Sequence, residues 1–266
     1  MSTATHKKLV RAEFTRQAEE YAAAPGIRDT DHIAKLIAQV APRPDARVLE
    51  VASGPGHVAL AFAKVCREVV GLDLTAAPVA IAERLKRERG ITNARFELGD
   101  AEKLPFRDAE FDVVICRFAV HHFARPKTVV GEMVRVCKPD GTVAMEDMIA
   151  SEHPARAAYH NRFERLRDTS HTRTLPLSEL ARVMASAGLE IVRFSSDGLK
   201  NPVEHWLANA HAEPDRAAKA RAMIERDLRE DLSGTHPVRV DGQLYFTHRI
   251  AIVVGRKLAR TGKRRR

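Results

Sequence analysis

Apolar residues in the first 45 positions recur at the spacing of helices. Phe14, Ala18 and Tyr21 fall at i, i+4 and i+7, and the apolar positions between 33 and 40 repeat this pattern. Pro25 and Gly26 interrupt the pattern, and two prolines follow its second half. The sequence therefore predicts two helices before residue 46.

From residue 46 the pattern changes to short β-rich runs that alternate with amphipathic segments. We expect strands at 47–51, 69–73, 95–98, 112–116 and 142–145, and helices at about 57–67, 76–89 and 126–137. A turn is expected at 138–141, where the sequence reads Lys-Pro-Asp-Gly. Strands that alternate with helices of this length predict a parallel sheet with helices on both faces.

The rest of the chain predicts more helices and two further strands. Helices are expected to about residue 168 and at 178–187, 203–211 and 215–231, with Ser178 as the N-cap of the second. Strands are expected at 189–194 and 244–254, which makes seven in all. The connections at 150–177 and 196–243 are too long for turns, so we interpret them as a lid over a site. We divide the chain into N-terminal helices (1–45), a core (46–149), a lid with the remaining strands (150–255) and a tail (256–266).

Composition is that of an ordinary soluble protein. The chain has 266 residues, of which 44% are apolar and 30% charged, enough to bury one large core. We find neither the roughly 20-residue apolar stretch of a membrane helix nor a signal peptide, so we expect a cytoplasmic protein. Cys66, Cys116 and Cys137 are odd in number and scattered, which argues against disulfides and against a zinc site, and no metal is expected.

The positive charge is concentrated at the C-terminus. Seven of the Lys and Arg residues lie in 256–266 with no acid among them, so the net charge of +9 falls to +2 for the rest of the chain. We interpret this tail as a solvated end. The alternative is a contact with nucleic acid or an acidic surface.

Polar residues follow five predicted strands. The segments concerned are 50–56, Asp73, 99–101, Arg117-Phe118 and Glu146-Asp147. In an open parallel sheet, ligands bind outside the carboxyl ends of the strands. The five segments therefore predict a single cleft along one edge of the sheet.

The first three segments indicate a cofactor that contains a nucleoside. Gly54 and Gly56 let the backbone approach a ligand closely before the next helix. Asp73 lies 19 residues after Gly54, a distance suited to a carboxylate that binds a ribose diol, and Asp100 can accept a hydrogen bond from an exocyclic amine. Residues 54–59 also fit the dinucleotide fingerprint, so an NAD(P)-dependent oxidoreductase is an alternative.

Longer motifs favour another class of cofactor. The segments 50–56, 99–106 (Gly-Asp-Ala-Glu-Lys-Leu-Pro-Phe), 111–114, 121–122 and 136–141 occur in an order and spacing that resemble class I S-adenosylmethionine-dependent methyltransferases. The resemblance is strong over 46–149 and looser at Phe14–Tyr21 and the closing strand. A dehydrogenase would not be expected to carry the motifs at 99–106 and 138–141.

The resemblance implies a Rossmann-like α/β fold and methyl transfer from S-adenosylmethionine, which leaves S-adenosylhomocysteine. The acceptor it implies is an O, N, S or C nucleophile of a small molecule, phenolic or quinone-like in character. It also implies cofactor contacts for Tyr21, Glu50, Ala52, Ser53, Gly54, Gly56, Asp73, Leu74, Asp100, Ala101, Arg117 and Phe118. Glu50 would bind the cofactor's ammonium group or orient the loop, and Ala52 stands where the family usually has glycine.

Within the family, the motifs most resemble the ubiquinone/menaquinone-biosynthesis group and its small-molecule relatives. The quinone group carries Arg-Asn where this chain has His121-His122, so the general small-molecule branch fits better. Either histidine is a candidate base that takes a proton from the acceptor, and the structural alternative is a histidine that holds the loop.

The predicted lid offers further candidates for contact with the acceptor. These are Tyr159, Arg162 and Trp206, beside His160 and His205, and the alternatives are a solvated helix face or core packing. An RNA or protein methyltransferase guided by the basic tail is a second function to be tested. A homodimer is compatible with the sequence.

Overall fold

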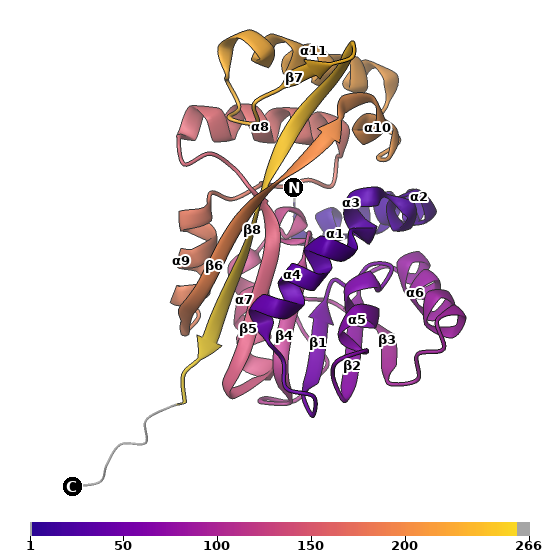
Figure 1. Cartoon of the computed structure of the whole chain (residues 1–266), viewed down its shortest axis with the longest axis vertical. Coiled ribbons are helices and arrows are strands. Elements are labelled where there is room, and N and C mark those ends of the chain that lie inside the picture. Colours follow the sequence, from indigo (N-terminus) through magenta and orange to yellow (C-terminus); the bar gives the residue numbers. More distant parts are fainter. Residues whose placement is uncertain (1, 260–266) are drawn as a thin grey trace, which may run out of the picture.

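The computed structural model describes residues 2–259, which form one eight-stranded sheet with helices on both faces (Figure 1). The strand order is β3-β2-β1-β4-β5-β8-β6, and β7 pairs with β8 off this path. Strands β1 to β5 run parallel, and β8 is antiparallel to both of its long neighbours. The bounds are β1 Arg47–Val51, β2 Glu68–Asp73, β3 Ala94–Leu98, β4 Phe111–Arg117, β5 Cys137–Ile149, β6 Leu189–Pro202, β7 Val238–Val240 and β8 Gln243–Lys257.

The prediction of seven strands was one short, because β7 forms a hairpin with β8. Val240 pairs with Gln243 across Asp241 and Gly242, both of which have positive φ angles, 50° and 78°. An Asp-Gly pair is the preferred sequence for such a two-residue turn. The sequence therefore contained the signal for this hairpin, but the strand before it has only three residues.

Two predicted boundaries also differ from the structure. Strand β6 continues to Pro202 beside β8, so residues 196–202 belong to the sheet and not to the lid. The predicted turn at 138–141 lies within β5, between the pairs Phe111–Cys137 and Val113–Thr142, where the register shifts. Asp140 has a φ of 58° there, so the turn sequence forms a bulge.

The N-terminal 40 residues form four helices and not two: α1 Thr3–Arg16, α2 Ala18–Ala23, α3 Pro25–Arg28 and α4 Thr30–Val40. The Asp29 side chain accepts hydrogen bonds from the backbone N–H groups of Asp31 and His32, which begins α4 after the short α3. Helices α1 and α2 cross above the carboxyl ends of the parallel strands, whereas α4 packs on the sheet (Figure 1).

Two apolar clusters hold the helices to the two faces of the sheet. One face is covered by α4, α5 (His57–Phe62) and α6 (Ala76–Glu88), and the other by α7 (Pro126–Val136) and α9 (Leu177–Ser186). Helix α9 begins at Leu177 with Pro176 as its N-cap, so Ser178 is not the cap. The Ser178 hydroxyl instead donates a hydrogen bond to Glu152 Oε2 at 2.6 Å.

Above the sheet, three helices form a lid with its own core. These helices are α8 (Pro154–Arg167), α10 (Val203–Ala208) and α11 (Pro214–Glu230), and the upper ends of β6 and β8 run into them (Figure 1). Phe163, Trp206 and Phe246 meet edge to face at their centre, with ring centroids 4.9–5.8 Å apart. The lid is therefore built on the same sheet as strands β1 to β5.

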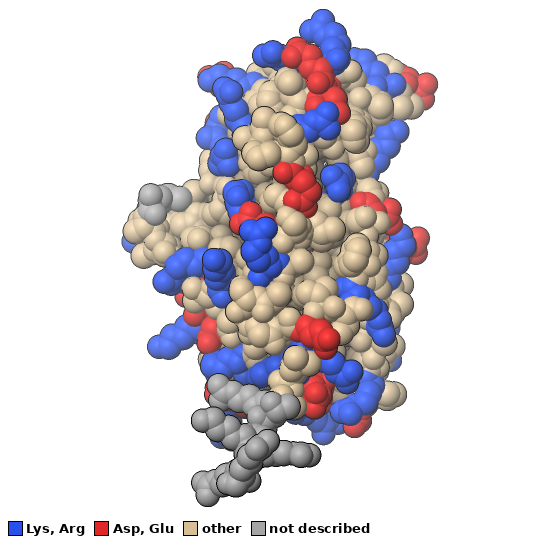
Figure 2. All heavy atoms as spheres, turned by 90° about the vertical axis from the view of Figure 1, so that its left-hand side faces the viewer, with Lys and Arg blue, Asp and Glu red and all other residues tan. Residues whose placement is uncertain are grey.

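The C-terminal basic segment begins later than predicted. Arg256 and Lys257 belong to β8, and Lys257 Nζ donates to the carbonyls of Val134 and Cys137. The remaining basic residues, 260–266, lie outside the described residues. Acidic side chains are interspersed among Lys and Arg on the face shown in Figure 2. No helix of the described chain is long and apolar enough to cross a membrane.

Removing one ring from the lid core should weaken folding strongly. Phe246 is fully buried, so Phe246→Ala should lower the free energy of unfolding by about 3–5 kcal/mol through lost burial and the cavity left behind. Phe194 on β6 is 67% exposed, and Phe194→Ala should change that free energy by no more than about 0.5 kcal/mol. Urea unfolding measures both values, and equal losses would contradict the lid core.

Candidate functional site

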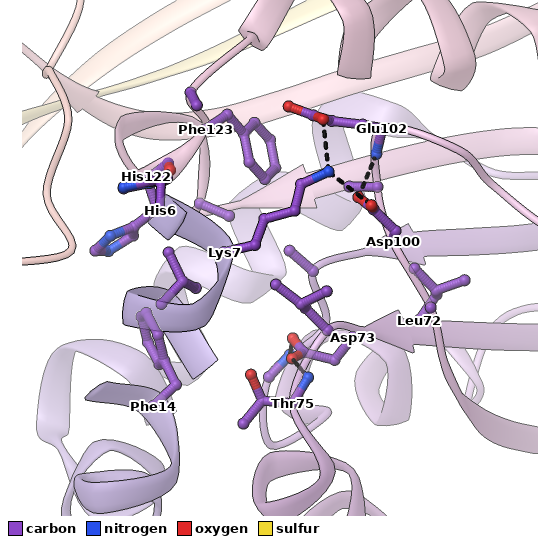
Figure 3. Close-up of a pocket in the computed structure, with 18 of the residues that line it drawn as sticks. His6, Lys7, Phe14, Leu72, Asp73, Thr75, Asp100, Glu102, His122 and Phe123 are labelled. Atoms are coloured by element: carbon purple, nitrogen blue, oxygen red, sulfur yellow. Dashed lines mark hydrogen bonds and ion pairs between the residues drawn. The ribbon is translucent and has the colours of Figure 1, made fainter. Parts of the chain in front are cut away.

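Two cavities meet where the parallel strands end. We call the first the strand-end cavity (Figure 3); it is bounded by α1 and by residues 72–75, 99–102 and 118–124. The second, the lid cavity, lies between these strand ends and the lid and has a volume of about 310 Å³. Four side chains line both: Phe14, Tyr21, Phe118 and His122. A ligand in one cavity would thus lie next to a ligand in the other.

The loop after β1 is held in a left-handed conformation beside the strand-end cavity. Ala52, Gly54 and Gly56 have φ angles of 56°, 51° and 78°. The Gly54 N–H donates to Asp73 Oδ2 at 2.8 Å, and the Ser53 N–H donates to the Leu72 carbonyl at 3.0 Å. The loop is thereby tied to the end of β2, and the hydroxyl of Ser53 is buried without a hydrogen-bond partner.

The two predicted carboxylates of β1 and β2 are both held by backbone amides. Glu50 Oε2 accepts from the N–H of Ala59 at 2.8 Å, so it orients the start of α5. Asp73 accepts from the N–H groups of Gly54 and Thr75. Burial raises the pKa of Glu50 to about 8, although the Ala59 N–H opposes this, and burial also raises the pKa of Asp73.

A lysine that the sequence did not indicate extends into the strand-end cavity. Lys7 Nζ lies 2.6 Å from Asp100 Oδ2 and 2.5 Å from Glu102 Oε2 (Figure 3). This contact joins α1 to the loop after β3, where Ala101 also lines the cavity, as Leu74 does after β2. Lys7 is 93 residues from Asp100, so no local pattern could reveal the pair.

Arg117 and Phe118 both lie at the strand ends, where Phe118 lines both cavities and Arg117 has structural contacts of its own. The Arg117 guanidinium lies 3.1 Å from Glu146 Oε2 and donates to the carbonyls of Gly26 and Ile27 in α3. It also lies over the ring of Phe118, 4.2 Å from its centroid. Arg117 thus fixes the N-terminal helices and the Phe118 ring, which stands between the two cavities.

The two adjacent histidines have opposite environments. His121 Nδ1 lies 2.6 Å from Asp147 Oδ1, and Asp147 Oδ2 accepts from the His121 backbone N–H. Burial lowers the pKa of His121, but the Asp147 carboxylate outweighs it and raises the pKa above 6.5. Burial and the neighbouring His121 lower the pKa of His122 to about 4, so His122 is neutral at pH 7.

His122 is held by residues from two other segments, helix α1 and the segment after α8. Its Nδ1 lies 3.0 Å from the hydroxyl of Ser170, which itself donates to Asp168 Oδ1 at 2.6 Å. The Phe14 ring meets the imidazole edge to face at 5.0 Å. The backbone carbonyl of His122 contacts His6 Nε2 at 2.7 Å. Sequence reasoning missed Ser170 and His6, because neither belongs to a motif.

The structure brings only some of the residues predicted to contact the acceptor to the lid cavity. Trp206 lines the lid cavity while it packs in the lid core, and His205 also lines this cavity. Tyr159 and Arg162 line neither cavity, which corrects the prediction. The Tyr159 hydroxyl donates to the Met223 carbonyl, and Arg162 lies on the solvent face of α8, because the helix turns its other face toward the cavity. Lining residues that sequence reasoning missed include Arg167, Asn201 and His248.

Comparisons with known proteins agree with this geometry. The sequence profile of a family described as "Methyltransferase domain" matches residues 49–145. The uncharacterized methyltransferase YcgJ of Bacillus subtilis is 34% identical over 203 residues, which are 76% of this chain and 80% of that protein. Its crystal structure has a TM-score of 0.81 at 30% identity and covers 86% of this chain and 99% of that one. The ubiquinone/menaquinone biosynthesis C-methyltransferase UbiE of Burkholderia mallei is 34% identical over 126 residues, 46% of this chain and 51% of that protein.

The close packing of the loop after β1 predicts a specific sensitivity. A Cβ at Gly56 would lie 2.6 Å from Phe96 Cζ and 2.9 Å from Ala82 Cβ, whereas a Cβ at Gly90 meets nothing within 4 Å. Both glycines have positive φ angles, so alanine at either position costs about 1–2 kcal/mol of strain. Gly56→Ala should lower the free energy of unfolding by about 1–3 kcal/mol more than Gly90→Ala. Equal effects in urea unfolding would refute the tight packing.

Proposed function

Because the chain belongs to the class I S-adenosylmethionine-dependent methyltransferases, we propose that it methylates a small molecule bound in the lid cavity. The observation that carries this proposal is the contact between the two cavities, which share Phe14, Tyr21, Phe118 and His122 as walls. A donor in one and an acceptor in the other would be adjacent. The volume of about 310 Å³ suits a small acceptor.

The residues of the strand-end cavity fit the cofactor. Asp73, Asp100 and Ala101 line this cavity; Asp73 would accept hydrogen bonds from the ribose hydroxyls, and Asp100 with Ala101 would border the adenine. Gly54 exposes its backbone to an adjoining hollow that Glu50 and Arg117 also line. The amino-acid end of S-adenosylmethionine would lie there. When bound, S-adenosylmethionine supplies a methyl group on a positively charged sulfonium. The chain itself contributes orientation and the exclusion of water.

His121 is the better candidate for the base that takes a proton from the acceptor. Its Nδ1 faces Asp147, which fixes the ring and leaves Nε2 as the nitrogen that receives the proton. The carboxylate of Asp147 then stabilises the imidazolium that forms. The charged or titratable groups around His121 are Asp147 on β5, Glu164 on α8, Asp168, and the histidines His122 and His171.

In this proposal His122 is an uncharged residue that lines both cavities and does not accept the proton. The Ser170 hydroxyl donates to Asp168, so its free lone pair accepts from His122 Nδ1–H. A histidine with a pKa of about 4 is a weak base at pH 7. The pair of histidines therefore divides into a base and a positioning residue that separates the two cavities.

The proposal is tested with S-adenosylmethionine labelled with tritium in the methyl group. A bacterial extract is separated into small molecules, RNA and protein, and each fraction is incubated with the full chain. We expect the label in the small-molecule fraction. Label in RNA or protein instead would contradict the proposal and favour the alternative that the basic tail guides a macromolecular substrate.

Two variants test the assignment of Asp73 to the cofactor in a separate binding measurement. Asp73→Asn should bind S-adenosylhomocysteine roughly 10- to 100-fold more weakly by calorimetry, because hydrogen bonds to a charged group contribute about 1.5–3 kcal/mol. Asp108→Asn, whose side chain is exposed and paired with Arg135, should bind normally. If both variants bound equally well, the assignment of Asp73 to the cofactor would be wrong.

The protonation of His121 can be measured without knowing the acceptor. In the histidine NMR spectrum, the signal lost in His121→Gln should titrate above pH 6.5. In Asp147→Asn the same signal should titrate at lower pH, because the carboxylate that stabilises the imidazolium is gone. Methyl transfer needs the neutral imidazole of His121, so the rate of methyl transfer should rise as the pH increases through the pKa of His121. In Asp147→Asn this rise should occur at a lower pH. An unchanged His121 titration in Asp147→Asn would exclude the pairing.

A further inference from the structure

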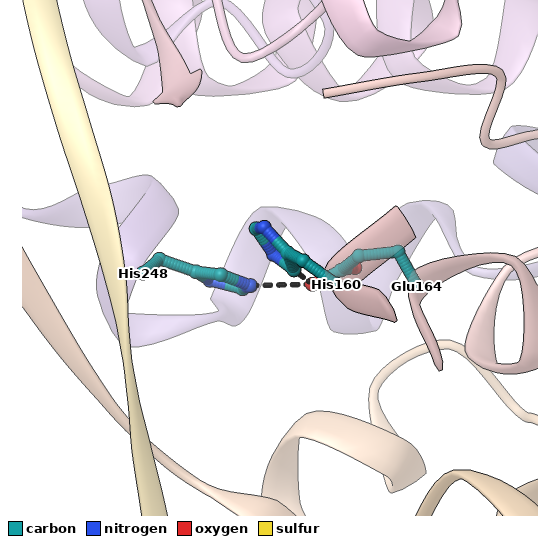
Figure 4. Close-up of side chains that lie close together, drawn as sticks. All are labelled: His160, Glu164 and His248. Atoms are coloured by element: carbon teal, nitrogen blue, oxygen red, sulfur yellow. Dashed lines mark hydrogen bonds and ion pairs between the residues drawn. The ribbon is translucent and has the colours of Figure 1, made fainter. Parts of the chain in front are cut away.

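Three buried side chains converge beside the lid cavity without a role in methyl transfer. His160 and Glu164 lie one turn apart on α8, and His248 faces them from β8 (Figure 4). Glu164 Oε1 lies 3.3 Å from His160 Nε2 and 2.6 Å from His248 Nε2. One ligand atom from each residue lies within 4.8 Å of the other two. The two elements thus direct three metal-ligating groups at one point.

The carboxylate of this cluster has no strong cationic partner. Glu164 is 1% exposed, and within residues 2–259 its ion-pair partners are the imidazoles of His160 and His248, with no Lys or Arg. A buried carboxylate is costly unless it is paired with a positive charge or coordinates a metal. The buried Glu146 has an arginine partner, Arg117, and the buried Asp147 is paired with one imidazole, whereas two imidazoles from different elements share the Glu164 carboxylate.

We propose that His160, Glu164 and His248 bind a divalent transition-metal ion such as Zn²⁺. Two imidazoles and one carboxylate are a ligand set of catalytic zinc and non-haem iron sites. Ligand atoms about 2.0–2.2 Å from a tetrahedral ion are about 3.3 Å apart, as His160 and Glu164 already are. The 2.6 Å contact of His248 with Glu164 must open by less than about 1 Å, and the nitrogen atoms of the two imidazoles, which lie within 4.8 Å of each other, must reach a similar separation of about 3.3 Å.

The remaining coordination position would face the lid cavity. His248 lines this cavity, and so does Asn201, whose side-chain amide lies 3.1 Å from His248 Nδ1. The nitrogen of this amide also donates to the Leu199 carbonyl at 2.8 Å, so a metal-bound imidazole, which carries its proton on Nδ1, would require the Asn201 side chain to rotate away from it. Three protein ligands with an open fourth position leave room for water or an oxygen, nitrogen or sulfur atom of the acceptor. This use of the ion rests on the proposed function, but the site itself does not.

The test measures metal binding directly on the full chain after treatment with a chelator. Zn²⁺ is titrated by calorimetry, and Co²⁺ is followed by its visible absorption. We expect one ion per chain and an absorption typical of a low-symmetry Co²⁺ site. Glu164→Gln and His248→Gln should each weaken binding by roughly 100-fold or more, since outer partners alone account for 10–100-fold.

Matched variants separate this site from adventitious binding by other histidines. His171→Gln removes a buried imidazole bonded to Asn161, and His205→Gln removes an exposed one at the lid cavity; both should bind the ion normally. A crystal of the wild-type chain grown with Zn²⁺ should show an anomalous peak between the three side chains, which does not require any variant to fold. Absence of the peak, or equal affinity in all four variants, would overturn the site.

The same variants distinguish this proposal from the proposed function. Glu164→Gln and His248→Gln should bind S-adenosylhomocysteine as the wild type does, because none of the three ligands lines the strand-end cavity. Loss of Zn²⁺ binding with normal S-adenosylhomocysteine binding would support the metal site. Normal Zn²⁺ binding in both variants would disprove it, whatever molecule proves to be methylated.

Discussion

The hydrogen-bonded ladder along β8 connects the two halves of this protein. Its lower part pairs with β5 from Arg256–Thr142 to Arg249–Ile149, and β6 follows its other edge up to the Tyr245–Pro202 pair. Backbone pairing on both sides fixes the direction of the strand, so the residues at its upper end enter the lid at defined positions. Phe246 reaches the lid core and His248 the lid cavity by this route. The distance between the lid and the strand ends is therefore set by the sheet.

A second constraint closes the site from the N-terminal side. The buried Arg117 pairs with Glu146 and donates to two carbonyls of α3, so one guanidinium joins β4, β5 and the N-terminal helices. Burial of such a charge is tolerated because its donors are satisfied. Lys7 adds a contact between α1 and the loop after β3. The strand-end cavity is thereby enclosed by residues from the beginning of the chain.

The histidines around the lid cavity show how position changes the chemistry of one residue type. His121 faces a carboxylate at the end of β5, whereas His122 faces a hydroxyl from the segment after α8. The pKa of His121 is raised and the pKa of His122 is lowered to about 4, although the two residues are adjacent in sequence. His160 and His248 share a second carboxylate, that of Glu164, between the lid and the sheet. Each of these roles depends on a partner distant in sequence.

The sequence by itself determined the parallel sheet and the place of the strand-end cavity. Hydrophobic periodicity is local, and the carboxyl ends of parallel strands must meet at one edge, so Gly54, Asp73, Asp100 and Phe118 could be brought together in advance. The sequence indicated lid helices, but it could not predict which of their side chains line the lid cavity. A helical segment does not reveal which face it buries, so Tyr159 and Arg162 were expected at a cavity that they do not line.

Only the tertiary structure decided the pairs that cross the fold. Lys7 meets Asp100 across 93 residues, and His248 meets Glu164 across 84. Such pairs follow from strand register and helix packing, which no short motif encodes. A shift of the register by one residue would turn the side chains of a strand to the opposite face of the sheet. For this chain, local pattern therefore determined which segments meet at the strand-end cavity. Long-range packing decided which side chains line the lid cavity and which of them carry charge.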